Sequence, residues 1–68
     1  METYRLLHHC DDVCWWFESP DIPGMTGGGA SYAESRKMGE EAVRFTLERD
    51  DVIVEHYVPE AARLVPAA

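Results

Sequence analysis

Basic residues are scarce in this sequence. Lysine and arginine number six against thirteen aspartate and glutamate residues, which gives a formal charge of −7 in a chain of 68 residues. Proteins that bind nucleic acid or an anionic membrane directly need clustered basic side chains to neutralise phosphate. The composition therefore predicts neither ligand. It suits a basic protein partner, which an acidic chain attracts electrostatically; the other interpretation is that the charge serves only solubility.

The sequence also lacks long apolar runs and has only two cysteines. No run approaches the roughly 20 residues of a membrane-spanning helix. Residues 1–5 lack the basic-then-apolar pattern of a signal peptide, so we expect a cytoplasmic protein with reduced thiols. The length predicts one domain, residues 1–68, with a core over about residues 3–59 and a short tail at 60–68. A chain this short buries only about 60% of its unfolded surface, so we also expect a homo-oligomer, a dimer or larger.

The middle of the chain holds two prolines and a glycine that predict a rigid elbow. Pro20 and Pro23 fix their own φ angles and bias the residues before them toward extended backbone. Gly24 follows Pro23 directly, which is typical of a turn. We expect the chain to leave an aromatic strand, pass this elbow and a glycine-rich segment, and then start a helix.

Two segments before the elbow predict a β-hairpin. Residues 3–9 and residues 13–18 have strand-like content and are separated by Asp11 and Asp12, which favour a turn. In a strand, successive side chains point to opposite faces. The alternation places Tyr4, Leu6 and His8 on one face of the first strand and Arg5, Leu7 and His9 on the other.

The second strand of this hairpin is aromatic. We assign Val13, Trp15 and Phe17 to the face that a helix covers, which leaves Trp16 on the open face. An exposed tryptophan on an open face is typical of an interface. The alternative is that Trp16 lies flat over Arg5 or a neighbouring strand and binds nothing.

Residues 25–30 predict a weak third strand, at an edge or as a bulged loop, because glycine has no side chain to pack. Ser31 and Glu34 then fit the capping-box pattern of a helix start. The helix is expected to end near residue 47 or 49. Its predicted buried stripe consists of Met38, Ala42, Phe45 and Leu47, with Tyr32 or Ser35 one turn earlier.

Gly39, inside this helix, is expected to allow a close approach to the sheet. Residues 52–58 predict the last strand, and a strand–helix–strand order allows it to lie parallel to an earlier strand. The whole pattern is therefore an α+β fold of the order β-β-β-α-β, with one helix packed on one face of a sheet.

Residues that carry chemistry give only weak signals. His8, His9 and Cys10 suggest a zinc site, but a structural site needs four ligands in paired spacing, and two adjacent strand residues point to opposite faces. Gly27 to Gly29 before a helix start could cradle a phosphate, but the lysine of a P-loop is missing. We predict no catalytic, cofactor-binding or metal-binding residues, and no enzyme, because no pair of carboxylates is placed by strands.

The order of these motifs resembles a known family. Residues 18–26 read Glu-Ser-Pro-Asp-Ile-Pro-Gly-Met-Thr after an aromatic strand. A helix follows that opens Ser-Tyr-Ala-Glu-Ser and closes Glu-Glu-Ala-Val-Arg-Phe-Thr-Leu, and then a strand. Over about residues 4–59 the chain resembles the HicB antitoxins of type II toxin–antitoxin systems.

The resemblance implies a partial RNase H-like fold without nuclease activity. It also implies a partner, HicA, a small basic toxin with a double-stranded-RNA-binding-type fold that cleaves mRNA and is neutralised by direct binding. Members usually carry a C-terminal DNA-binding module. Residues 61–68 are too few to form one, so we expect no direct nucleic-acid binding and no autorepression by this chain alone. A second departure is Gly27 to Gly29, where the family more often has polar residues.

We predict a partner-contact region around the elbow. Its residues would supply an aromatic anchor, charge complementarity and rigid presentation; they are Trp16, Glu18, Asp21, Pro23 and Gly24. For Pro23 and Gly24 a purely structural role is the stronger alternative. A second hypothesis is a self-associating orphan HicB-like regulatory or accessory domain with no toxin partner. A third is an enzyme or metal protein that uses His8, His9 and Cys10.

Overall fold

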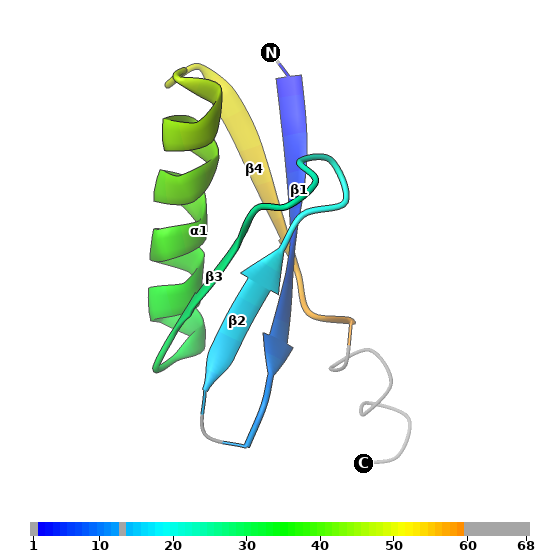
Figure 1. Cartoon of the computed structure of the whole chain (residues 1–68), viewed down its shortest axis with the longest axis vertical. Helices are drawn as coiled ribbons and strands as arrows, with labels where there is room; N and C mark the ends of the chain where they lie inside the picture. The colour runs from blue at the N-terminus through cyan, green and yellow to red at the C-terminus, as the bar shows by residue number, and fades with distance from the viewer. Residues whose placement is uncertain (1, 13, 60–68) are drawn as a thin grey trace.

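The computed structural model describes residues 2–12 and 14–59. The elements follow in the order β1 (Glu2–Cys10), β2 (Trp15–Glu18), β3 (Thr26–Gly29), α1 (Tyr32–Leu47) and β4 (Val52–Tyr57). The strands form one sheet in the spatial order β3-β2-β1-β4, and α1 packs on one of its faces (Figure 1). The predicted α+β fold of order β-β-β-α-β is therefore confirmed.

Strand pairing follows the chain order. β1 pairs antiparallel with β2, and β2 pairs antiparallel with β3, which lies at the edge of the sheet as predicted. β4 returns after α1 and pairs parallel with β1, because the helix provides the crossover that parallel strands need. The N-terminal strand thus lies in the interior of the sheet, between β2 and β4.

The element boundaries differ from the predicted ones by one or two residues. β1 extends the predicted strand by one residue at each end, whereas β2 begins only at Trp15. Val13, which we assigned to the covered face, and the predicted tail at residues 60–68 lie outside the described residues. β3 and β4 are slightly shorter than predicted, whereas α1 ends at Leu47, which is one of the two predicted ends.

The two faces of the sheet are divided as the alternation predicted. Leu6 and His8 are fully buried beneath α1, and Phe17 is nearly so, while Arg5 is exposed. Burial of apolar side chains between helix and sheet supplies the main stabilising term of such a fold. The buried apolar core consists of Leu6, Phe17, Ile22, Val43 and Val52.

The start of α1 is capped as predicted, with one variation. Ser31 is extended, and its side-chain oxygen accepts a hydrogen bond from the backbone N–H of Glu34 at 3.1 Å. The carboxylate of Glu34 accepts from the N–H of Ala30 at 2.8 Å, rather than from the N–H of Ser31. The first bond satisfies a backbone donor that a helix start leaves without an intrahelical partner, and the second ties the residue before the N-cap to the first turn.

The predicted buried stripe of α1 is confirmed only in part. Ala42 and Leu47 pack against the core, whereas Met38 is 44% exposed and Phe45 is 75% exposed. Ser35, one of the two residues predicted one turn earlier, is buried together with Gly39 and Val43, and these three lie four residues apart on one face. A Cβ atom on Gly39 would lie 2.6 Å from Cδ1 of Leu6. The helix therefore approaches β1 through its smallest side chains, and the close approach predicted for Gly39 is confirmed.

Candidate functional site

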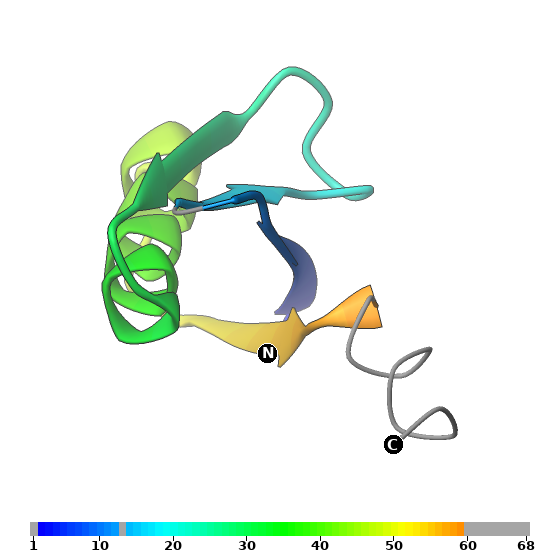
Figure 2. The ribbon, with the colours of Figure 1, turned by 90° about the horizontal axis from the view of Figure 1, so that it is seen from below.

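The sheet face that points away from α1 carries exposed apolar side chains. Trp16 is 40% exposed, Ile53 44% and Tyr57 45%, and each alternates along its strand with residues that face the helix. Residues 19–25, which connect β2 to β3, arch out on the side of the sheet away from α1 (Figure 2). We call this surface the open face.

Trp16 on the open face is held by its neighbours. It is the register partner of His9 across the β1–β2 pair, and the two rings stack with centroids 4.2 Å apart and planes inclined by 26°. Nε2 of His9 lies 2.8 Å from Oε2 of Glu18. Trp16 thus lies flat over a neighbouring strand, as one of the two alternatives predicted, and still presents two fifths of its surface to solvent.

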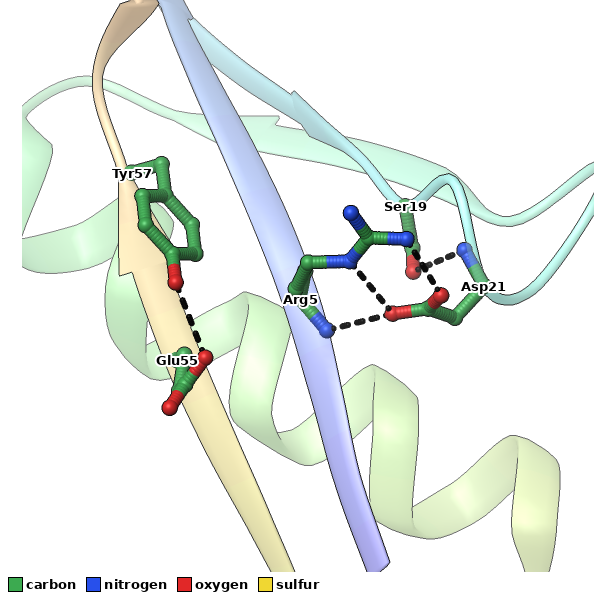
Figure 3. A network of polar contacts seen from close by, with 5 residues as sticks. All are labelled: Arg5, Ser19, Asp21, Glu55 and Tyr57. Atoms are coloured by element: carbon green, nitrogen blue, oxygen red, sulfur yellow. Dashed lines mark hydrogen bonds and ion pairs between the residues drawn. The ribbon is translucent and has the colours of Figure 1, made fainter.

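Asp21 ties the elbow to β1. Its Oδ2 accepts hydrogen bonds from the backbone N–H of Arg5 at 2.9 Å and from Nε at 3.1 Å, and its Oδ1 accepts from Nη2 at 2.8 Å (Figure 3). The side-chain oxygen of Ser19 accepts from the N–H of Asp21 at 3.1 Å. These hydrogen bonds from Arg5 lower the pKa of Asp21 to about 2. Because both carboxylate oxygens are used within the chain, Asp21 holds the elbow in place.

The elbow itself is a tight turn. The N–H of Met25 donates to the carbonyl of Ile22 at 3.3 Å, so Pro23 and Gly24 are the two central residues. Gly24 has a φ of +84°, which L-residues rarely adopt. Ile22 is buried, while Pro23 and Gly24 are exposed. Pro23 and Gly24 thus combine the structural role with exposure to solvent.

We expect Gly24→Val to lower the melting temperature of the protein. A Cβ atom at this position meets nothing within 4 Å, so the cost comes only from a positive φ, about 1–2 kcal/mol for a branched side chain. Gly24→Asn is the matched control, since asparagine tolerates this conformation better and should lose less. Thermal unfolding of the three proteins tests this; an unchanged melting temperature in Gly24→Val would disprove the role assigned to the turn.

A shallow cavity of about 470 Å³ opens beside the elbow. It is lined by Arg5, Leu7, Tyr57, Val58 and Pro59. The hydroxyl of Tyr57 donates a hydrogen bond to Glu55, two residues earlier on β4, at 2.9 Å (Figure 3). This bond holds the phenol ring along the strand. An apolar side chain of a partner would fit such a cavity, because its walls are largely hydrocarbon with a guanidinium at one side.

The structure brings together most of the residues predicted from the sequence. Trp16, Glu18 and Asp21 share the open face, with the exposed turn beside them. Sequence reasoning did not assign Arg5 and His9 to the site, although the strand alternation had already placed both on this face. Their roles depend on long-range contacts with Asp21 and Trp16.

The metal and phosphate hypotheses gain no support. His8 and His9 lie on opposite faces of the sheet, as predicted, with His8 in the core and His9 on the open face. Among residues 2–12 and 14–59, no group of three or more His, Cys, Asp or Glu side chains is placed to hold a metal ion. The three glycines of β3 have a packing role: a Cβ on Gly27 would lie 2.6 Å from the Phe17 ring, and one on Gly28 would overlap the carbonyl oxygen of Trp15.

Comparison with known proteins gave no match to a family model, to a curated protein or to a solved structure. In the part of the chain that the structure describes, no helix is long and apolar enough to span a membrane.

Proposed function

We propose that this chain is a HicB-like antitoxin that binds and neutralises a small basic, HicA-like, mRNA-cleaving toxin in the cytoplasm. The resemblance at residues 18–26 motivates the proposal, and the order β-β-β-α-β is the fold that the resemblance implies. In this proposal the chain acts by binding a protein; it has no catalytic role and does not contact nucleic acid itself.

The observation that carries the proposal is the presentation of Trp16. It stands 40% exposed and stacked on His9, beside an elbow that Asp21 fastens to β1. Side chains held rigid before binding lose little entropy on association, and tryptophan is enriched among residues that dominate interface affinity. Glu18 borders this surface and suits a basic partner.

One observation favours the alternative of a self-associating orphan domain. Met38 and Phe45 lie two helical turns apart on α1, and both are exposed. Apolar residues at this spacing form a stripe along a helix that another copy could cover. A homo-oligomer through this stripe is compatible with toxin binding through the open face, because the two surfaces belong to different layers.

Co-expression with the product of the nearest small basic open reading frame beside its gene tests the proposal. We expect the two proteins to co-purify and to elute together in size-exclusion chromatography. Elution of this chain as a homo-oligomer free of that protein would contradict the antitoxin proposal and favour the orphan domain.

A further inference from the structure

A chain of hydrogen bonds through two histidines fastens α1 to the sheet. The side-chain oxygen of Ser35 lies 2.8 Å from Nδ1 of His8, and Nε2 of His8 lies 2.8 Å from Nδ1 of His56. Nε2 of His56 lies 2.7 Å from Oε2 of Glu40. The chain therefore starts and ends on α1 and passes through β1 and β4. We call it the histidine chain.

The carboxylate of Glu40, at one end of the histidine chain, decides which nitrogen of each neutral ring carries the proton. The hydrogen bond from His56 is the largest cause that lowers the pKa of Glu40, and the hydrogen bond from Arg44 at 3.3 Å lowers it further. The carboxylate of Glu40 therefore accepts the hydrogen bond from His56. When both rings are neutral, His56 donates through Nε2 and accepts through Nδ1. His8 consequently donates through Nε2 and accepts from the hydroxyl of Ser35 through Nδ1. Both rings are neutral in this arrangement, and each carries its proton on Nε2.

The histidine chain can accept one further proton, but it cannot accept two. If both rings were imidazolium, two N–H groups would face each other across the 2.8 Å that separates His8 from His56. The extra charge would also lie beneath α1, where His8 and Ser35 are fully buried. Transfer of an unpaired charge into such a site is costly.

The surroundings of His8 offer little to stabilise a positive charge. Its ring contacts Tyr32 edge-on at 5.2 Å and stacks on His56 at 5.0 Å, and its own hydrogen bonds join it to Ser35 and His56 and not to a carboxylate. Cationic Arg36 and His9 disfavour protonation further, and Glu40 lies beyond His56. The titratable and charged groups around His8 are Tyr32, Arg36, Glu40 and Arg44 from α1, His9 from β1 and His56 from β4.

We propose that the histidine chain is an acid-sensitive latch, which holds α1 on the sheet while His8 is neutral and releases it when His8 takes up a proton. This inference does not depend on the proposed antitoxin function. Burial, and after it the neighbouring His56, lowers the pKa of His8 from its ordinary value of 6.5 to about 4. Between these two values the unfolded chain binds the proton and the folded chain does not. Stability is therefore complete above pH 6.5 and falls as the pH drops toward 4.

Unfolding by urea at about pH 7.5, 6.5 and 5.5 tests the latch, because carboxylates titrate below this window. We expect the folding equilibrium constant to fall by about fivefold between pH 6.5 and 5.5 through His8. His8→Gln should flatten this dependence, and His9→Gln, on the open face, is the matched control that should keep it. A flat profile in the unaltered protein, or a profile that His9→Gln abolishes, would overturn the proposal.

A second measurement covers the case in which His8→Gln does not fold. Nitrogen chemical shifts of the unaltered protein at about pH 7.5 report the tautomer of each ring, and hydrogen exchange reports the protection of the α1 amides. We expect His8 and His56 both to carry the proton on Nε2, and α1 to lose protection at about pH 5.5 before the β1–β2 pair does. A proton on Nδ1 of His8, or uniform loss of protection, would contradict the latch.

Discussion

Gly39→Leu is expected to destabilise the protein by about 3 kcal/mol, at the upper end of the cost of overfilling a packed core. A Cβ atom alone would already lie 2.6 Å from Cδ1 of Leu6, which is fully buried, and the rest of the leucine side chain would need further space between α1 and β1. The better helix propensity of leucine offsets only about 1 kcal/mol of this cost. Urea unfolding monitored by circular dichroism measures the difference.

The matched control places the same side chain elsewhere on the same helix. Glu41 is exposed on α1, so Glu41→Leu should change the free energy of unfolding by only about 0.5 kcal/mol or less. Equal stability of Gly39→Leu and Glu41→Leu would show that α1 does not pack on β1 through Gly39.

If the chain binds a toxin as proposed, Trp16→Ala is expected to weaken that binding by about 2 kcal/mol or more, which is roughly 30-fold in Kd. The substitution removes an exposed aromatic ring that His9 holds in position. Isothermal titration calorimetry of the complex measures Kd, and thermal unfolding shows how much of the loss reflects stability of the free chain.

Phe45→Ala is the matched control for Trp16→Ala. Phe45 is even more exposed, at 75%, but it stands on α1, in the other layer of the molecule. Its removal should leave Kd unchanged and affect only self-association. If Phe45→Ala weakened toxin binding and Trp16→Ala did not, the contact surface would lie on the helix and not on the open face.

Local patterns predicted the strands and the helix well, because these patterns arise from short-range geometry. The alternation along residues 3–9 correctly separated Leu6 and His8, which lie under the helix, from Arg5, since strand side chains alternate between faces. Ser31 and Glu34 correctly predicted the helix start. Of the two capping-box hydrogen bonds, the one to Ser31 is as predicted, and the carboxylate of Glu34 accepts from Ala30 instead of Ser31.

The buried face of α1 could not be predicted from apolar content. Met38 and Phe45 are large apolar residues of the helix and were therefore assigned to the buried stripe, but both are exposed. The face that packs on the sheet consists of Ser35, Gly39 and Val43, because the backbone approaches β1 closely at Gly39. Small residues carry little hydrophobic signal, so Ser35 and Gly39 were named singly, and the stripe that they form with Val43 was not recognised in the sequence.

The polar contacts that build the site join residues far apart in the chain. Arg5 and Asp21 meet because the elbow folds back over β1, and His8 meets His56 because β4 pairs parallel with β1. Each contact depends on strand order and register. Sequence patterns predicted that a parallel pairing was allowed, and did not specify which residues it would bring together.

Inhibition of RNA cleavage tests the central claim most directly. The small basic protein encoded beside this gene would be purified and assayed on an mRNA substrate, with this chain added in increasing ratio. Our account predicts that RNA cleavage stops when the unaltered chain is added in stoichiometric amount. In a parallel assay with Trp16→Ala at the same concentration, we expect RNA cleavage to continue. Cleavage that continues unchanged in the presence of excess chain would contradict the proposed antitoxin function.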